Sequence, residues 1–157
     1  MSLTNVTHST FTIERSYPHA PERVFSAFAT PEKRRRWFAE AENRKPEEFQ
    51  MDFRVGGRDL MRFRMGPDSP FPGAMVINHT TYLDIVPDRR IVYAYSMTLG
   101  EHRFSASLAT FEFRPSATGT DLIFTEQGAF FEGADGPKMR QEGWSHLIDS
   151  LTAELGR

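Results

Sequence analysis

The residues best suited to chemistry in this sequence begin with an acid that interrupts an apolar row. Glu126 follows Leu122 and Phe124 at every second position of "LIFTEQ", so the period of a β-strand places its carboxyl group on the apolar face. A buried carboxylate is costly unless it is paired, hydrogen-bonded or hydrated. We therefore expect Glu126 either to pair with an arginine or to border a cavity, and the sequence leaves both alternatives open.

His79 and Tyr95 are the other polar candidates on alternating segments. A period of two assigns His79, in the segment 74–86, to a row that we expect to face inward, and Tyr95 to the inward row of 89–99. The first row would consist of Ile77, His79, Thr81, Leu83 and Ile85. An acid–base pair of Glu126 and His79 would suit proton abstraction or hydration. A histidine among apolar groups is, however, more often a satisfied core residue than a ligand contact.

Most other chemistries lack the residues that they need. The chain has no cysteine, which excludes disulfides and thiolate sites and fits a cytoplasmic protein, and its five histidines show no metal-binding spacing. A net charge of −2 offers no general attraction to phosphate backbones, and the basic run at 32–36 is typical of a solvated helix face. We expect no metal, no cofactor and no nucleic-acid partner, and no catalytic residues can be assigned.

Length and composition favour one domain, 1–157, with a large apolar core. The first ten residues have no basic start followed by an apolar run, so we expect neither a secretion signal nor a membrane anchor. The chain is rich in Phe, with 14, and also has 4 Tyr, 2 Trp and 7 Met. Such side chains usually fill cores, and they also line adaptable apolar cavities.

The polar candidates have to be positioned by an antiparallel sheet of about seven strands, the number of alternating runs. The first strand is expected at 9–17, and a hairpin is expected about Gly56-Gly57, with Phe49, Met51, Phe53 and Val55 on one face of its first strand. The segments 74–86 and 89–99 pair next, and two last strands follow, the second ending near Gln127.

Helices are predicted at two places. Pro21 and Pro31 begin two short helices after the first strand. A long C-terminal helix carries an apolar stripe of Trp144, Leu147, Ile148, Leu151 and Leu155. The inward rows of the sheet are the surface that can cover this stripe. The predicted fold is therefore α+β, with a strongly curved antiparallel sheet wrapped around the C-terminal helix.

Five segments together resemble the SRPBCC (START-like, Bet v 1-like) superfamily: "APERVFSAFATPEKRRRWF", "FRVGG", "YLDIVPDRRIVYAYSM", "TDLIFTEQGAFF" and "GWSHLIDSL". Within it the chain is similar, from about Phe11 to Leu155, to proteins related to the C-terminal domain of the activator of heat-shock protein 90 ATPase. The resemblance implies the helix-grip fold and, commonly, a cavity between sheet and helix. It does not imply one function, because this fold hosts lipid carriers, hormone receptors, aromatic cyclases and co-chaperones.

We expect a cytoplasmic binding protein for a small apolar or amphipathic ligand, with no membrane partner. A co-chaperone or interaction module, with a chaperone as partner, is the first alternative, and an enzyme of cyclase or hydrolase type is the second. The ligand cavity, of about 300 Å³ or more, is expected to be covered by a loop containing Phe130 and Phe131. Its predicted lining residues are Phe53, Phe63, His79, Tyr95, Met97, Glu126, Trp144 and Ile148.

Overall fold

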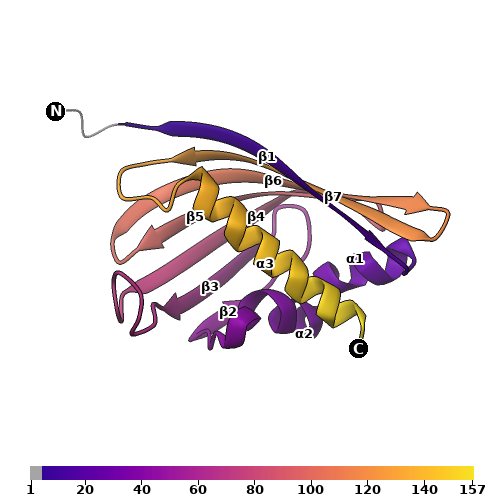
Figure 1. Ribbon diagram of the computed structural model, residues 1–157, viewed down its shortest axis with the longest axis horizontal. Helices are drawn as coiled ribbons and strands as arrows, with labels where there is room; N and C mark the ends of the chain where they lie inside the picture. Colours follow the sequence, from indigo (N-terminus) through magenta and orange to yellow (C-terminus); the bar gives the residue numbers. More distant parts are fainter. Residues whose placement is uncertain (1–4) are drawn as a thin grey trace.

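The computed structural model describes residues 5–157, and it confirms the predicted α+β helix-grip architecture (Figure 1). The strands are β1 (Thr7–Tyr17), β2 (Glu48–Gln50), β3 (Arg58–Arg64), β4 (Met75–Val86), β5 (Arg90–Leu99), β6 (His102–Ser116) and β7 (Gly119–Phe130). They form one antiparallel sheet in the order β1-β7-β6-β5-β4-β3-β2. The helix α3 (Pro137–Leu155) crosses the concave face of this sheet diagonally.

The helical segments after β1 begin as predicted and continue further. Proline opens both α1 (Pro21–Ala29) and α2 (Pro31–Arg34), because its missing N–H group is not needed in a first turn. The chain then passes directly into a π-helical turn, η1 (Arg35–Ala39), and a 3-10 turn, η2 (Ala41–Asn43). These segments lie at one end of the sheet, and α1 and α2 lie near the C-terminal half of α3 (Figure 1).

Aromatic side chains fill the core between the sheet and the helices. Phe28 of α1 packs against Phe111 and Phe113 of β6, with ring centroids 4.9 and 5.2 Å apart. Phe124 stacks on Phe111 at 4.6 Å and contacts Trp144 of α3 at 4.4 Å. In the predicted apolar stripe of α3, four residues are buried, namely Trp144, Ile148, Leu151 and Leu155, and Leu147 is half-buried. The chain's richness in phenylalanine therefore serves mainly to fill the core.

The strand β4 turns the opposite face inward from the one predicted. Its buried row consists of Val76, Asn78, Thr80 and Tyr82. His79 is exposed on the convex face, so the prediction that its row faces inward is wrong. A bulge between Tyr82 and Asp84 then shifts the phase, and Ile85 packs against the core. Both rows of this segment carry β-branched or apolar residues, so alternation alone did not determine the buried face.

The predicted hairpin and the end of the last strand also need correction. The first hairpin strand, β2, ends at Gln50, because the segment that follows leaves the sheet and Phe53 packs into the core from a loop. Val55 is exposed. At the other boundary β7 continues through Phe130, whose side chain is buried, so it does not belong to a loop over a cavity mouth. Within residues 5–157, no helix is long and apolar enough to cross a membrane.

Candidate functional site

Glu126 lies at the centre of a buried polar cluster between the sheet and α3. Its side chain is 0% exposed. The hydroxyl group of Tyr95, on β5, and the indole Nε1 of Trp144, at 2.9 Å, both donate hydrogen bonds to Glu126 Oε1. Nη1 of Arg140 lies 3.6 Å from Oε2. Of the two alternatives for Glu126, pairing with an arginine is therefore confirmed.

Arg140 connects this cluster to the beginning of α3. Its guanidinium donates to the Tyr95 hydroxyl at 3.0 Å and to the Ser105 hydroxyl of β6 at 2.8 Å. Two further bonds of 2.8 and 2.9 Å reach the carboxylate of Asp135, in the loop before the helix. The guanidinium also lies 5.1 Å from the ring centroid of Phe130. Arg140 is thus held from several sides and fixes the orientation of Tyr95.

Burial dominates the electrostatics of the cluster. Burial raises the pKa of Glu126, and the hydrogen bond from Tyr95 and the charge of Arg140 only partly oppose it. Burial also raises the pKa of Tyr95 well above its usual value, so its hydroxyl stays protonated and remains a donor. Among residues 5–157, Oε2 of Glu126 has no hydrogen-bond partner. The carboxyl group is therefore incompletely satisfied in this core.

A cavity of about 180 Å³ opens beside the cluster, between the first half of α3, η2 and strands β3 to β5. Its apolar wall consists of Phe38, Ala41, Met61, Phe63, Met97, Met139 and Leu147. The polar and charged groups that border it are Glu42, Arg44, Asn78, Tyr95, Asp135 and Arg140. Trp144, Gly143 and His146 complete the side formed by α3. The cavity is smaller than the roughly 300 Å³ that was expected.

The structure brings together four of the eight predicted lining residues, namely Phe63, Tyr95, Met97 and Trp144. Glu126 contacts Tyr95 and Trp144 but does not line the cavity itself. Ile148 is buried in the core. Phe53 packs elsewhere, against Phe25 and Tyr82, at centroid distances of 5.7 and 5.1 Å.

His79 points away from Glu126, so the acid–base pair suggested by the sequence does not form. Because β4 buries the row that contains Asn78, this residue borders the cavity and His79 does not. An amide offers both a donor and acceptors to a ligand and does not titrate near neutral pH. The cavity therefore carries hydrogen-bonding groups without the predicted imidazole base.

Several residues of the site were not predicted, although some left a signal. Arg140 precedes Trp144 by four residues, so helical spacing extends the apolar stripe of α3 back to an arginine. That spacing indicates that Arg140 shares the inward face of the helix with Trp144. Assigning Asn78 to the cavity requires knowing which face of β4 is buried. Arg44 follows an irregular segment, which has no periodicity that could indicate its direction. Neither could be assigned to the cavity from the pattern alone.

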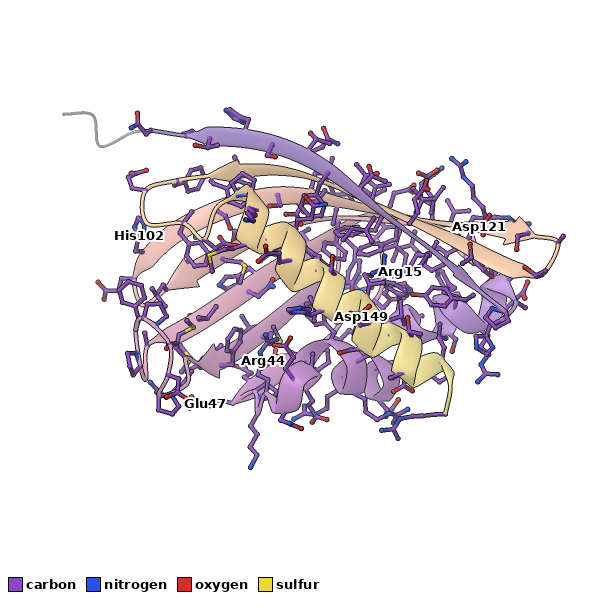
Figure 2. All side chains as sticks on the ribbon, in the orientation of Figure 1. Arg15, Arg44, Glu47, His102, Asp121 and Asp149 are labelled. Carbon is purple, nitrogen blue, oxygen red and sulfur yellow. The ribbon has the colours of Figure 1, made fainter. Side chains whose placement is uncertain are left out.

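The conformation of η2 positions Arg44 at the cavity. Glu42 and Asn43 both adopt left-handed backbone conformations, with φ of 56° and 61°. Two consecutive non-glycine residues in this region are uncommon and strained. Arg44 then lies with its guanidinium carbon 4.3 Å from the ring centroid of Phe63. In Figure 2 it lies beside the helical segment that follows α2.

A second buried polar group lies deeper in the core and supports one wall of the cavity. Arg34 is almost fully buried, with its guanidinium carbon 4.0 Å from the ring centroid of Phe38. It donates to the hydroxyl of Tyr93 at 3.4 Å, and burial raises the pKa of that tyrosine to about 12. Phe38 is therefore packed between Arg34 and the cavity. In the part of the chain that the structure describes, no group of three acidic or histidine side chains could hold a metal ion.

The curved sheet closed by a long C-terminal helix defines the class of the protein as SRPBCC, or Bet v 1-like. A more specific match comes from the family model described as Activator of Hsp90 ATPase homolog 1-like protein, which covers residues 18–156. The chain belongs to this family. A comparison with curated proteins gave no significant match.

Solved structures of similar proteins share this fold. The Mll3558 protein from Rhizobium loti is 49% identical over 96% of this chain and 99% of its own, with a TM-score of 0.86. An uncharacterized protein from Rhizobium leguminosarum is 36% identical over 99% of both chains, with a TM-score of 0.92. An AHSA1-like protein from Aeromonas hydrophila, 20% identical over 94% of this chain and 92% of its own, shares the fold with a TM-score of 0.68.

Proposed function

We propose that this protein binds a small apolar or amphipathic molecule in the cavity beneath α3. The observation that carries the proposal is the combination of an apolar wall with a few fixed polar groups in one recess, which is typical of ligand sites. Cavities of roughly 150 Å³ admit a benzene molecule. A volume of about 180 Å³ therefore suits a compound with one aromatic ring or a short alkyl chain.

The wall of the cavity is suited to accommodate such a compound. Met61, Met97 and Met139 contribute side chains from β3, β5 and α3. Methionine is unbranched and polarizable, so it adapts to irregular ligands and contacts aromatic rings favourably. The bonds from Arg140 and Trp144 hold Tyr95 in place, and a fixed hydroxyl loses little conformational entropy when a ligand binds.

The same geometry favours binding over catalysis. Glu126, the acid–base candidate of the sequence, is fully buried behind Tyr95 and Trp144, and both residues already bind its Oε1. A general base has to reach the proton that it abstracts, either directly or through one water molecule. Glu126 does not line the cavity, so it acts here as a positioning residue for Tyr95 and Trp144.

The two tryptophans provide a direct test of binding. Trp144 lines the cavity, whereas Trp37 is buried and donates its indole N–H to the carbonyl of Ala27 at 2.7 Å. In a ¹H–¹⁵N titration with the neutral probe phenylacetamide, we expect the indole signal of Trp144 to shift with saturation while that of Trp37 changes little. The absence of a saturable shift at Trp144 would contradict the proposal.

The family assignment favours one alternative function, in which the protein acts on a chaperone. The matching family model is described as homologous to an activator of Hsp90 ATPase. If this chain has that activity, adding it to a purified Hsp90-type chaperone should raise the rate of ATP hydrolysis and the two proteins should co-elute. An unchanged rate and no co-elution would remove this alternative.

A further inference from the structure

Most of the charged residues at the mouth of the cavity have an oppositely charged or basic partner. Oε1 of Glu42 lies 3.0 Å from Nδ1 of His146. The carboxylate of Asp135 receives two hydrogen bonds from Arg140. Both carboxylates that line the cavity therefore already have a basic partner, and Arg140 has a full set of acceptors.

Arg44 is the exception among these charged groups. Across residues 5–157, its guanidinium forms no ion pair with a carboxylate. Its one hydrogen bond through the side chain is a long one, 3.5 Å from Nη1 to the carbonyl of Phe38. Stacking over Phe63 covers one of its faces with an apolar ring. A half-buried cation in this position lacks an anionic partner.

Electrostatics and backbone geometry both favour an anion at this position. Burial lowers the pKa of Arg44, and the negative charge of Glu42 offsets this only in part, so an added anion would relieve the cost of burying the charge. The left-handed conformations of Glu42 and Asn43 are a local strain, and they present the next residue to the cavity. Strained segments of this kind occur most often at binding sites.

We propose that Arg44 is the anion-recognition residue of this cavity, and that its ligands are small monocarboxylates with one aromatic ring or a short alkyl chain. The inference rests on the proposed binding function and specifies the ligand class. The planar fork of a guanidinium matches the two oxygens of a carboxylate, and the apolar wall accommodates the rest of the molecule. A doubly charged phosphate is disfavoured because the carboxylates of Glu42 and Asp135 also line the cavity and repel a second negative charge.

The test compares two probes of nearly the same shape, phenylacetate and its neutral amide, phenylacetamide. Wild-type protein should bind phenylacetate about tenfold more tightly, the effect of one charge-assisted contact at a partly exposed site. Arg44→Gln should abolish this preference, so that the two probes bind the variant with similar affinity. Arg44→Lys, which keeps the charge but lacks the fork, should retain part of the preference.

Arg89→Gln provides the matched control, because Arg89 is an exposed arginine in the turn before β5 and does not line the cavity. It changes the net charge equally and should preserve the preference. Equal affinities of wild-type protein for the two probes, or a preference that persists in Arg44→Gln, would overturn the role of Arg44 while leaving ligand binding intact. If neither probe binds, the proposed binding function itself fails.

Discussion

Glu126 is kept in the core by directional contacts whose partners come from β5 and α3. Tyr95 and Trp144 satisfy one carboxyl oxygen, and Arg140 approaches the other. The sequence predicted that Glu126 would be inward and costly, since alternation along β7 is regular. It could not predict which arginine would pair with it, because that choice depends on how α3 crosses the sheet.

The raised pKa of Glu126 has a consequence for the pH dependence of stability. Because the folded-state pKa is raised, the folded protein holds this proton at pH values where the unfolded chain has released it. The contribution of Glu126 to stability is therefore fully present below the unfolded pKa of about 4.3 and is lost as pH rises through the folded pKa. As pH rises through the folded pKa, the free energy of unfolding of Glu126→Gln should therefore increase relative to that of wild-type protein.

Urea denaturation of both proteins between about pH 4 and pH 8 would measure this difference, because the glutamine does not titrate. The informative quantity is the free energy of unfolding of the variant minus that of wild-type protein. If this difference falls with rising pH, then Arg140 holds the carboxylate ionised and the assigned direction of the pKa shift is wrong.

At the level of elements, α3 has two distinct halves. Its last turns pack Leu151 and Leu155 into the core, whereas Met139 and Gly143 of its first half and Leu147 at its middle line the cavity. The C-terminal half therefore secures the helix-grip fold, and the N-terminal half presents residues to a ligand. Figure 2 shows Asp149 on this helix near Arg15 of β1, and their 3.5 Å ion pair is partly solvated.

This division predicts unequal costs for two leucines in one stripe. Leu151→Ala should lower the free energy of unfolding by roughly 2–5 kcal/mol, because it removes a fully buried side chain. Leu147→Ala should cost distinctly less, since Leu147 is half-buried beside an existing cavity. Asp149→Ala, which removes a surface ion pair, should change stability by about 1 kcal/mol at most. Equal costs at the two leucines in chemical denaturation would contradict this account of α3.

The elements themselves were largely predictable, because hydrophobic periodicity and proline positions are local signals. Seven strands, two helices opened by Pro21 and Pro31, and the C-terminal helix all follow from them. The wrong face was assigned to β4 because both of its rows are compatible with burial. Half of the predicted cavity residues line the cavity, and the errors at His79 and Phe53 arise from that face and from the early end of β2.

Across the whole molecule, the dense aromatic core and the cavity lie under different parts of α3. Gly143 faces the cavity side, and a Cβ atom added there would meet no other atom within 4 Å. Glycine inside a helix is less favourable than alanine by about 1 kcal/mol. Gly143→Ala should therefore raise the free energy of unfolding by about this amount in chemical denaturation. A loss of stability would contradict the open space around Gly143.

The most direct test of the central claim uses a larger side chain at the same position. Gly143→Leu should occupy the mouth of the cavity between Met139 and Leu147 without removing any core contact. In the ¹H–¹⁵N titration with phenylacetamide, the account predicts that Gly143→Ala binds nearly as wild-type protein does. Gly143→Leu should remain folded and lose the saturable shift at Trp144, with affinity at least about tenfold weaker. Unchanged binding of phenylacetamide by folded Gly143→Leu would contradict the claim that the cavity beneath α3 is the ligand site.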